Sequence, residues 1–178
     1  MAIRNTLTSY GSVAKFFHWT IFFLILCMLI FGYFMEDFPA DYKAVAYNAH
    51  KLTGLLILSL MVLRLLWAWM NVKPMLPVMT RWWERLLERV VHFALYAVVI
   101  AMPLAGWVGS VAAGRLPQLG SFSFDLPIHQ DKSLAKTAFT WHKEIAIIII
   151  VLVSLHVFAA LYHHFVKKDD VLRRMMPR

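Results

Sequence analysis

The sequence predicts an all-α membrane protein, an antiparallel four-transmembrane-helix bundle, and two observations carry that prediction. Hydrophobic residues make up 61% of the 178 residues and charged residues only 16%, a composition typical of membrane proteins. Four mostly apolar windows reach the length of about 20 residues that spans the hydrocarbon layer. They lie at about 14–35, 45–70, 88–112 and 139–165. Lipid offers the backbone no hydrogen-bond partner, so we expect each window to be helical and residues 1–178 to form one domain.

The first window is also compatible with a cleaved signal peptide, because Arg4 and Lys15 precede its apolar residues. We favour a retained helix, since the apolar stretch is long enough to span and the exit FGYFMEDFPADY offers no small-x-small cleavage site. Cys27, the only cysteine, lies inside this window, which excludes an intrachain disulfide and a cysteine-based metal site. We interpret it as a packing or lipid-facing residue.

The connections predict where the later helices start. Two prolines in NVKPMLPVMTRWWERLLER end the second helix, and Thr80 is expected to cap the third. Pro103 and Gly106 inside the third window predict a kink and a close approach to another helix. The long connection 113–137 is expected to be irregular.

The cations predict the orientation, since Lys and Arg gather in short cytoplasmic loops. One side of the bundle would carry Arg4, Lys15, Lys73, Arg81, Arg85, Arg89, Lys167, Lys168, Arg173, Arg174 and Arg178. The other side would carry Lys43, Lys51, Arg115, Lys132, Lys136 and Lys143. Both termini are therefore expected to be cytoplasmic. We interpret the net charge of +8 as this topology signal and an attraction to membrane lipid, not as a sign of nucleic-acid binding.

Two histidines of the fourth window are candidate cofactor ligands. Fourteen positions separate His142 from His156, close to four helical turns, so both rings return to within about 40° of one face and lie about 21 Å apart along the axis. Ionisable groups inside a bilayer are costly and are therefore candidates for function. The separation is too large for one shared metal ion and suits two stacked cofactors, each with its own axial ligand.

Depth supplies each of these histidines with a partner from another helix. His50, at the outer start of the second helix, is level with His142, and His18, at the inner start of the first, is level with His156. Two depth-matched pairs are the pattern of two bis-histidine haems, with a neutral imidazole on each side of the iron. The alternative for any single histidine is a hydrogen-bonding role between helices.

Arg64 is a candidate partner for a haem propionate. It follows His50 by the same fourteen positions, which puts it on the ligand face of the second helix at the inner level. A guanidinium has the charge and fork geometry that a carboxylate prefers. The alternative is an arginine that snorkels to the headgroups. We expect His92, which has no partner at its depth, to be a hydrogen-bonding residue, and His129 to be solvated.

The assembled residues resemble the bacterial cytochrome b561 family, four-helix, di-haem, quinone-linked cytochromes that include superoxide oxidase. The resemblance covers nearly the whole chain and rests on KFFHWTIF, NAHKLTGLLILSLMVLRLLW, HFALYAVVIAMPLAGW, WHKE and SLHVFAALYHHFVKKDDVLRRMMP. It implies two haems b, one held by His18 and His156 and the other by His50 and His142. This set agrees with the pairing by depth.

The resemblance also implies an activity, a location and a quinone site. Members similar to superoxide oxidase take an electron from superoxide at the outer haem and reduce ubiquinone near the cytoplasmic end of the fourth helix, in the inner membrane. His163 matches a histidine of that quinone region and follows His156 by seven positions, on nearly the same face. An interfacial imidazole can donate a hydrogen bond and a proton to a quinone carbonyl, or it is only an interfacial polar residue. His164 points about 100° away and is expected to be solvated.

The electron donor stays open between superoxide and a periplasmic redox protein. Lys51, Lys132, Lys136 and Lys143 either steer an anion such as superoxide to the outer haem or form a solvated loop face. Two other functions also stay open. One is a membrane-anchor cytochrome for a separate dehydrogenase or hydrogenase, and the other is a non-haem transporter that uses its histidines for a divalent metal or protons.

Overall fold

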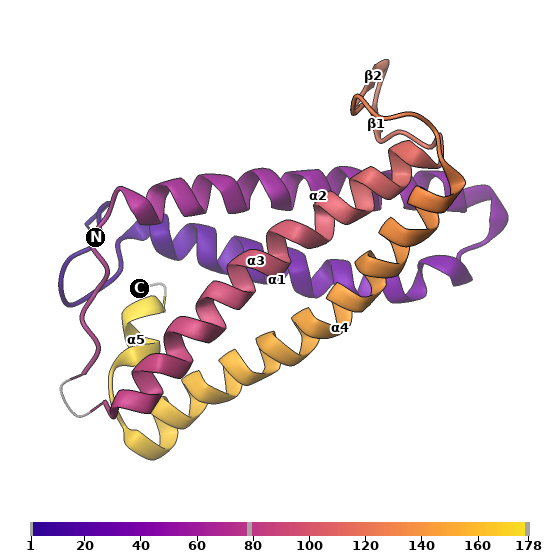
Figure 1. Ribbon diagram of the computed structural model, residues 1–178. Helices are drawn as coiled ribbons and strands as arrows, with labels where there is room; N and C mark the ends of the chain where they lie inside the picture. The colour runs from indigo at the N-terminus through magenta and orange to yellow at the C-terminus, as the bar shows by residue number, and fades with distance from the viewer. Residues whose placement is uncertain (1, 78–79, 177–178) are drawn as a thin grey trace.

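The computed structural model of the protein describes residues 2–77 and 80–176. Within these residues, four helices are long and apolar enough to cross a membrane: α1 (Ser12–Phe34), α2 (Ala40–Trp69), α3 (Trp82–Ala112) and α4 (Lys132–Tyr162). Each packs against the next in sequence, and the chain runs back and forth along the bundle (Figure 1). The predicted all-α membrane bundle is confirmed, whereas the cytoplasmic location of the termini stays a prediction.

The shorter elements define two ends of the bundle. They are η1 (Met35–Asp37), β1 (Gln118–Leu119), β2 (Phe122–Ser123), the π-helix η2 (His163–Lys167) and α5 (Val171–Met175). The N-terminal segment and α5 lie together at what we call the terminal end, and the β1–β2 hairpin lies at the opposite, hairpin end (Figure 1).

The connection between α3 and α4 is more regular than the sequence predicts. β1 and β2 pair antiparallel, with Gln118 opposite Ser123, and Gly120 turns the chain at a φ of 60° that glycine adopts without steric cost. α4 begins at Lys132, seven residues before the predicted window, because Asp131 caps it. The Asp131 carboxylate accepts hydrogen bonds from the backbone N–H groups of Ser133 at 2.7 Å and Leu134 at 3.1 Å.

The start of α3 also differs from its prediction. The helix begins at Trp82, six residues before the apolar window, because a carboxylate caps its polar first turn: Glu84 accepts a hydrogen bond from the backbone N–H of Arg81 at 2.9 Å. Thr80 is not the cap. Its hydroxyl donates to the carbonyl of Pro77 at 2.7 Å instead.

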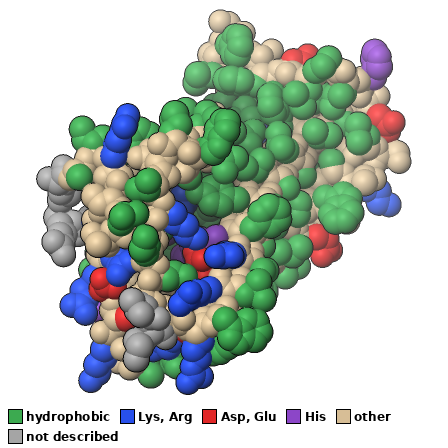
Figure 2. Space-filling view, turned by 60° about the vertical axis from the view of Figure 1, so that its left-hand side comes forward, with side chains coloured by type: hydrophobic (Ala, Val, Ile, Leu, Met, Phe, Trp, Pro, Cys, Tyr) green, Lys and Arg blue, Asp and Glu red, His purple; other side chains and the backbone are tan. Residues whose placement is uncertain are grey.

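The core lies at mid-height, and most large apolar side chains outside it face outward. The buried cluster consists of Ile21, Ile57, Met61, Val99 and Ile149. Large side chains such as those of Phe93 and Phe158 are exposed, as a lipid-facing surface requires. Figure 2 shows apolar side chains over much of one face and Lys and Arg side chains gathered at one end.

Hydrogen bonds from side chains to backbone carbonyls tie the terminal end together. The side-chain amide of Asn5 donates to the carbonyl of Val72 at 3.0 Å, and the indole N–H of Trp19 donates to the carbonyl of Met175 at 2.9 Å. Arg174 of α5 also donates to the carbonyl of Met75, so the N-terminal segment, the α2–α3 connection and α5 form one cap over the terminal end of the bundle. Tyr10 lies beneath it, and burial raises the pKa of its phenol above the usual 10.0.

Candidate functional site

Four histidines meet in two pairs inside the bundle. His50 of α2 and His142 of α4 have ring centres 6.0 Å apart, and His18 of α1 and His156 of α4 have ring centres 6.1 Å apart. The structure therefore brings together the residues that the sequence pairs by depth. The first pair lies toward the hairpin end and forms the outer site, and the second lies toward the terminal end and forms the inner site.

The spacing within each pair suits a metal centre between the rings. A metal ion about 2 Å from each of two imidazole nitrogens, with each nitrogen roughly 1.1 Å from its ring centre, puts the ring centres about 6 Å apart. The Nδ1 atoms of His18 and His50 are buried and have no hydrogen-bond partner within the described residues. Buried polar atoms usually have one, so these rings fit the role of ligands to a bound group.

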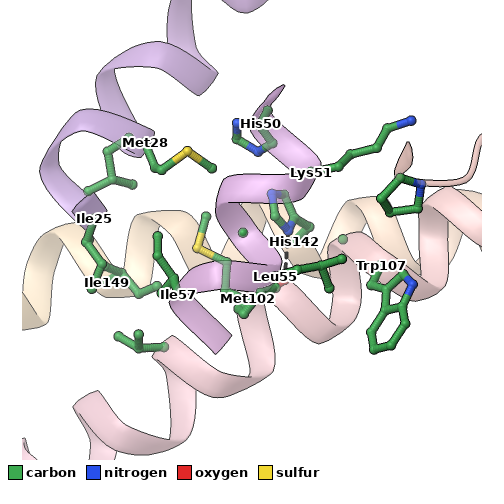
Figure 3. Close-up of a pocket in the computed structure, with 16 residues that line it drawn as sticks. Ile25, Met28, His50, Lys51, Leu55, Ile57, Met102, Trp107, His142 and Ile149 are labelled. Atoms are coloured by element: carbon green, nitrogen blue, oxygen red, sulfur yellow. Dashed lines mark hydrogen bonds between the residues drawn. The ribbon is translucent and has the colours of Figure 1, made fainter. Parts of the chain in front are cut away.

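His142 is oriented as metal-ligating histidines usually are. Its Nδ1 donates a hydrogen bond to the carbonyl of Met102 in α3 at 2.9 Å, which fixes the ring plane and leaves Nε2 for a metal (Figure 3). Two glycines make room for the outer rings. A Cβ at Gly106 would lie 2.9 Å from Nδ1 of His142, and a Cβ at Gly32 would lie 3.2 Å from Cε1 of His50.

The outer pair lines a pocket with about 620 Å³ of empty space, including the part open at its mouth. Most of its lining is apolar, including Met28, Leu55 and Ile149 (Figure 3). Lys51 adds one cation, and its Nζ donates to the carbonyl of Arg115 at 2.7 Å.

The inner pair lines a second pocket, with about 540 Å³ of empty space. Arg64 borders it from α2, with its guanidinium carbon 5.3 Å from the ring centre of Tyr96. Within the described residues, Arg64 forms no ion pair. Arg64 therefore lies at the level of the inner pair, and its pairing with a haem propionate stays a prediction.

A thin apolar wall separates the two sites. Ile25 of α1 and Val99 of α3 border both pockets. Val99 belongs to the buried core cluster, and Ile25 packs against that cluster. Two cofactors in these pockets would therefore be separated by apolar side chains.

His92 lies closer to the inner site than the sequence indicates. It lines the inner pocket, and its ring centre is 5.1 Å from that of His156. Its Nδ1 hydrogen-bonds to Glu88, as its predicted hydrogen-bonding role requires. The signal that identifies its face is the spacing of Glu88, His92 and Tyr96 at intervals of four, a polar stripe in an otherwise apolar helix.

His163 lies at the start of the π-helix, outside both pockets. Its Nδ1 is 2.5 Å from Oδ2 of Asp169, so the carboxylate orients the ring, and Nε2 has no hydrogen-bond partner among the described residues. Lys167 of the same element forms an ion pair with the buried carboxylate of Glu84 in α3. The ion pair holds the C-terminal end of α4 against the start of α3, whereas the contact between His163 and Asp169 is local to the segment that follows α4.

The last two histidines differ in their surroundings. His129 is exposed, as predicted. His164 was expected to be solvated, but its Nδ1 is buried and has no hydrogen-bond partner within the described residues. The α-helical step of about 100° per residue does not apply here, because His164 lies in the π-helix, which turns its side chain differently.

Comparison with known proteins supports a single assignment. A family model described as prokaryotic cytochrome b561 matches residues 9–178. Cytochrome b561 homolog 2 of Escherichia coli (strain K12) is 31% identical over 180 residues, covering 99% of this chain and 95% of that protein. Cytochrome b561 homolog 1 of the same organism is 27% identical, covering 95% and 97%. A probable superoxide oxidase CybB from Yersinia pestis is 28% identical, covering 90% and 92%.

Proposed function

The chain belongs to the prokaryotic cytochrome b561 family, and we propose from this premise that it holds two haems b and passes electrons between the periplasmic side of the inner membrane and the ubiquinone pool. Family membership and the four membrane-spanning helices make it a multi-pass bacterial membrane protein of electron transport, and the family name implies haem b. What we propose beyond this is the number of haems, their histidine ligands, ubiquinone as the electron acceptor and a location in the inner membrane.

The observation that carries the proposal is the pairing of histidines at two levels. His50 and His142 would hold the outer haem, and His18 and His156 the inner one, since each pair has the ring spacing that one iron between two imidazoles needs. Bound in this way, a haem supplies one-electron chemistry with no open coordination position, so electrons are exchanged by outer-sphere transfer.

The residues around the two sites support transfer through the bundle. Ile25 and Val99 border both pockets, so apolar side chains lie between the two sites. Arg64 would pair with a propionate of the inner haem, because its guanidinium borders that pocket and forms no ion pair within the described residues. Its charge also favours an added electron at the inner level.

The quinone is proposed to bind at the terminal end, beside His163. The Asp169 carboxylate orients its ring through Nδ1, so that Nε2 can donate a hydrogen bond to a quinone carbonyl. We expect His163→Phe to slow quinone reduction while leaving the haem content unchanged. His129→Phe, at an exposed histidine of the α3–α4 connection, is the control and is expected to keep both.

We propose superoxide as the electron donor, because one relative is named probable superoxide oxidase. Two superoxide anions would each give one electron and leave as dioxygen, and one ubiquinone would take both electrons and two protons to become ubiquinol. Lys51, which lines the outer pocket, would attract the anion.

A stopped-flow experiment tests this function. Oxidised protein is mixed with superoxide, and haem absorption is followed with and without ubiquinone. We expect haem reduction in both cases and faster re-oxidation with ubiquinone present. Haem that superoxide leaves oxidised, but that quinol or a co-purifying dehydrogenase or hydrogenase reduces, would remove the superoxide donor and favour the membrane-anchor function. A haem-free protein that binds zinc would favour the transporter.

A further inference from the structure

The rings of His142 and His156 are oriented in different ways. His142 donates from Nδ1 to the carbonyl of Met102, the usual arrangement for a ligand imidazole. Within the described residues, His156 has no hydrogen bond from either ring nitrogen to the protein. The plane of its ring therefore depends on packing contacts.

His92 of α3 provides the closest aromatic contact to that ring. The two ring centres are 5.1 Å apart and the ring planes are at 84°, an edge-to-face arrangement inside the favoured range of about 4.5–7 Å. The ring of His18 is further away, at 6.1 Å and 46°. Rotation of the His156 ring would break the edge-to-face contact with His92.

His92 is itself fixed by hydrogen bonds. Its Nδ1 lies 2.7 Å from the backbone carbonyl of Glu88 and 3.1 Å from its carboxylate oxygen Oε1. Both atoms are acceptors, so Nδ1 carries the proton and donates. The Glu88 carboxylate is held in turn by Lys73, whose Nζ lies 2.8 and 3.2 Å from its two oxygens. Lys73 belongs to the α2–α3 connection, so the ring of His92 is held by α3 and by the segment that precedes it.

We infer that His92, anchored by Glu88, is a positioning residue that sets the ring plane of His156. The inference rests on the proposed ligation of the inner haem by His156. The orientation of an axial imidazole affects the electronic structure of a low-spin iron, so removal of the His92 ring is expected to change the inner haem and leave the outer one unchanged.

Paired substitutions at His92 test this role by electron paramagnetic resonance of the oxidised protein. His92→Leu removes the aromatic edge, whereas His92→Phe keeps it. The inner signal is identified as the one that His18→Ala loses. We expect His92→Leu to shift that signal and the outer signal to stay constant. His92→Phe should keep the inner signal near its original position but broaden it, because a phenyl ring cannot donate a hydrogen bond to Glu88. Phe93→Leu, at the neighbouring position with 76% exposure, is the matched control.

A second pair of variants tests the anchor and serves if His92→Leu fails to assemble. Glu88→Leu removes the carboxylate acceptor and should broaden the inner signal, whereas Glu88→Gln keeps an acceptor oxygen and should restore it. Equal inner signals in His92→Leu and His92→Phe, or in the two Glu88 variants, would overturn the positioning role. An unmutated protein without two haems would instead contradict the proposed function, so the two failures are distinguishable.

Discussion

Replacing Gly106 with alanine is expected to weaken the outer haem selectively. The added Cβ would lie 2.9 Å from Nδ1 and 3.0 Å from Cε1 of His142, closer than side chains normally approach, so the proposed ligand ring must move. Overpacking of this kind costs about 1–3 kcal/mol, which corresponds to about a 5- to 150-fold loss of affinity if the strain falls on the bound state. Helix propensity does not explain such a loss, because alanine is a better helix former than glycine by about 1 kcal/mol.

Gly109→Ala is the matched control on the same helix. A Cβ at Gly109 would also lie 2.9 Å from its nearest neighbour, but that neighbour is the ring of Phe139 rather than a proposed ligand. Haem content per chain and redox titration of both variants measure the difference. Gly106→Ala should lose the outer haem or hold it weakly, and Gly109→Ala should retain both. A Gly106→Ala protein with two haems and an unchanged outer potential would refute the reasoning.

Three further predictions concern other parts of the bundle. Arg64→Gln should weaken retention of the inner haem by about 1.5–3 kcal/mol, the contribution of a charged hydrogen bond, and lower its potential; equal haem retention would argue for a snorkelling arginine. Asp131→Ala removes the cap of α4 and should lower stability by about 0.5–2 kcal/mol in thermal unfolding, with haem content unchanged. Burial raises the pKa of Tyr10 above 10.0, so the folded protein holds the phenolic proton more tightly than the unfolded chain and stability falls as pH rises past about 10. Tyr10→Phe should flatten that fall, and an unchanged pH profile would contradict the assignment.

The histidine pairs were predictable because helix geometry is regular. The fourteen positions between His142 and His156 fix two levels on α4 with a rise of about 1.5 Å per residue. His50 and His18 are each the histidine near the matching end of another apolar window. Depth therefore predicted the two pairs, whose ring centres lie 6.0 and 6.1 Å apart, although His92 lies near the same inner level as His18.

The contact between His92 and His156 was not predictable from depth. It depends on how α3 crosses α4, which is set by the packing of small residues such as Gly106 and Gly109 against α4 side chains. A polar stripe marks the face of α3 that carries His92, but the sequence does not say which helix that face meets. Only the assembled bundle reveals the edge-to-face contact.

The helix starts and the buried Nδ1 of His164 were missed for local reasons. Apolar windows locate the hydrocarbon layer, whereas a helix continues into polar residues as long as its first N–H groups are capped, as Asp131 does for α4. At His164, the sequence gives no sign that the α-helix widens into a π-helix.

The haem content of the unmutated protein and of four single alanine variants tests the central claim most directly. We expect two haems b per chain in the unmutated protein and one in each of His18→Ala, His50→Ala, His142→Ala and His156→Ala. The haem retained by His50→Ala and His142→Ala should have one spectrum, and that retained by His18→Ala and His156→Ala the other. A haem-free protein from haem-replete cells, or a loss pattern that pairs the histidines differently, would contradict the account.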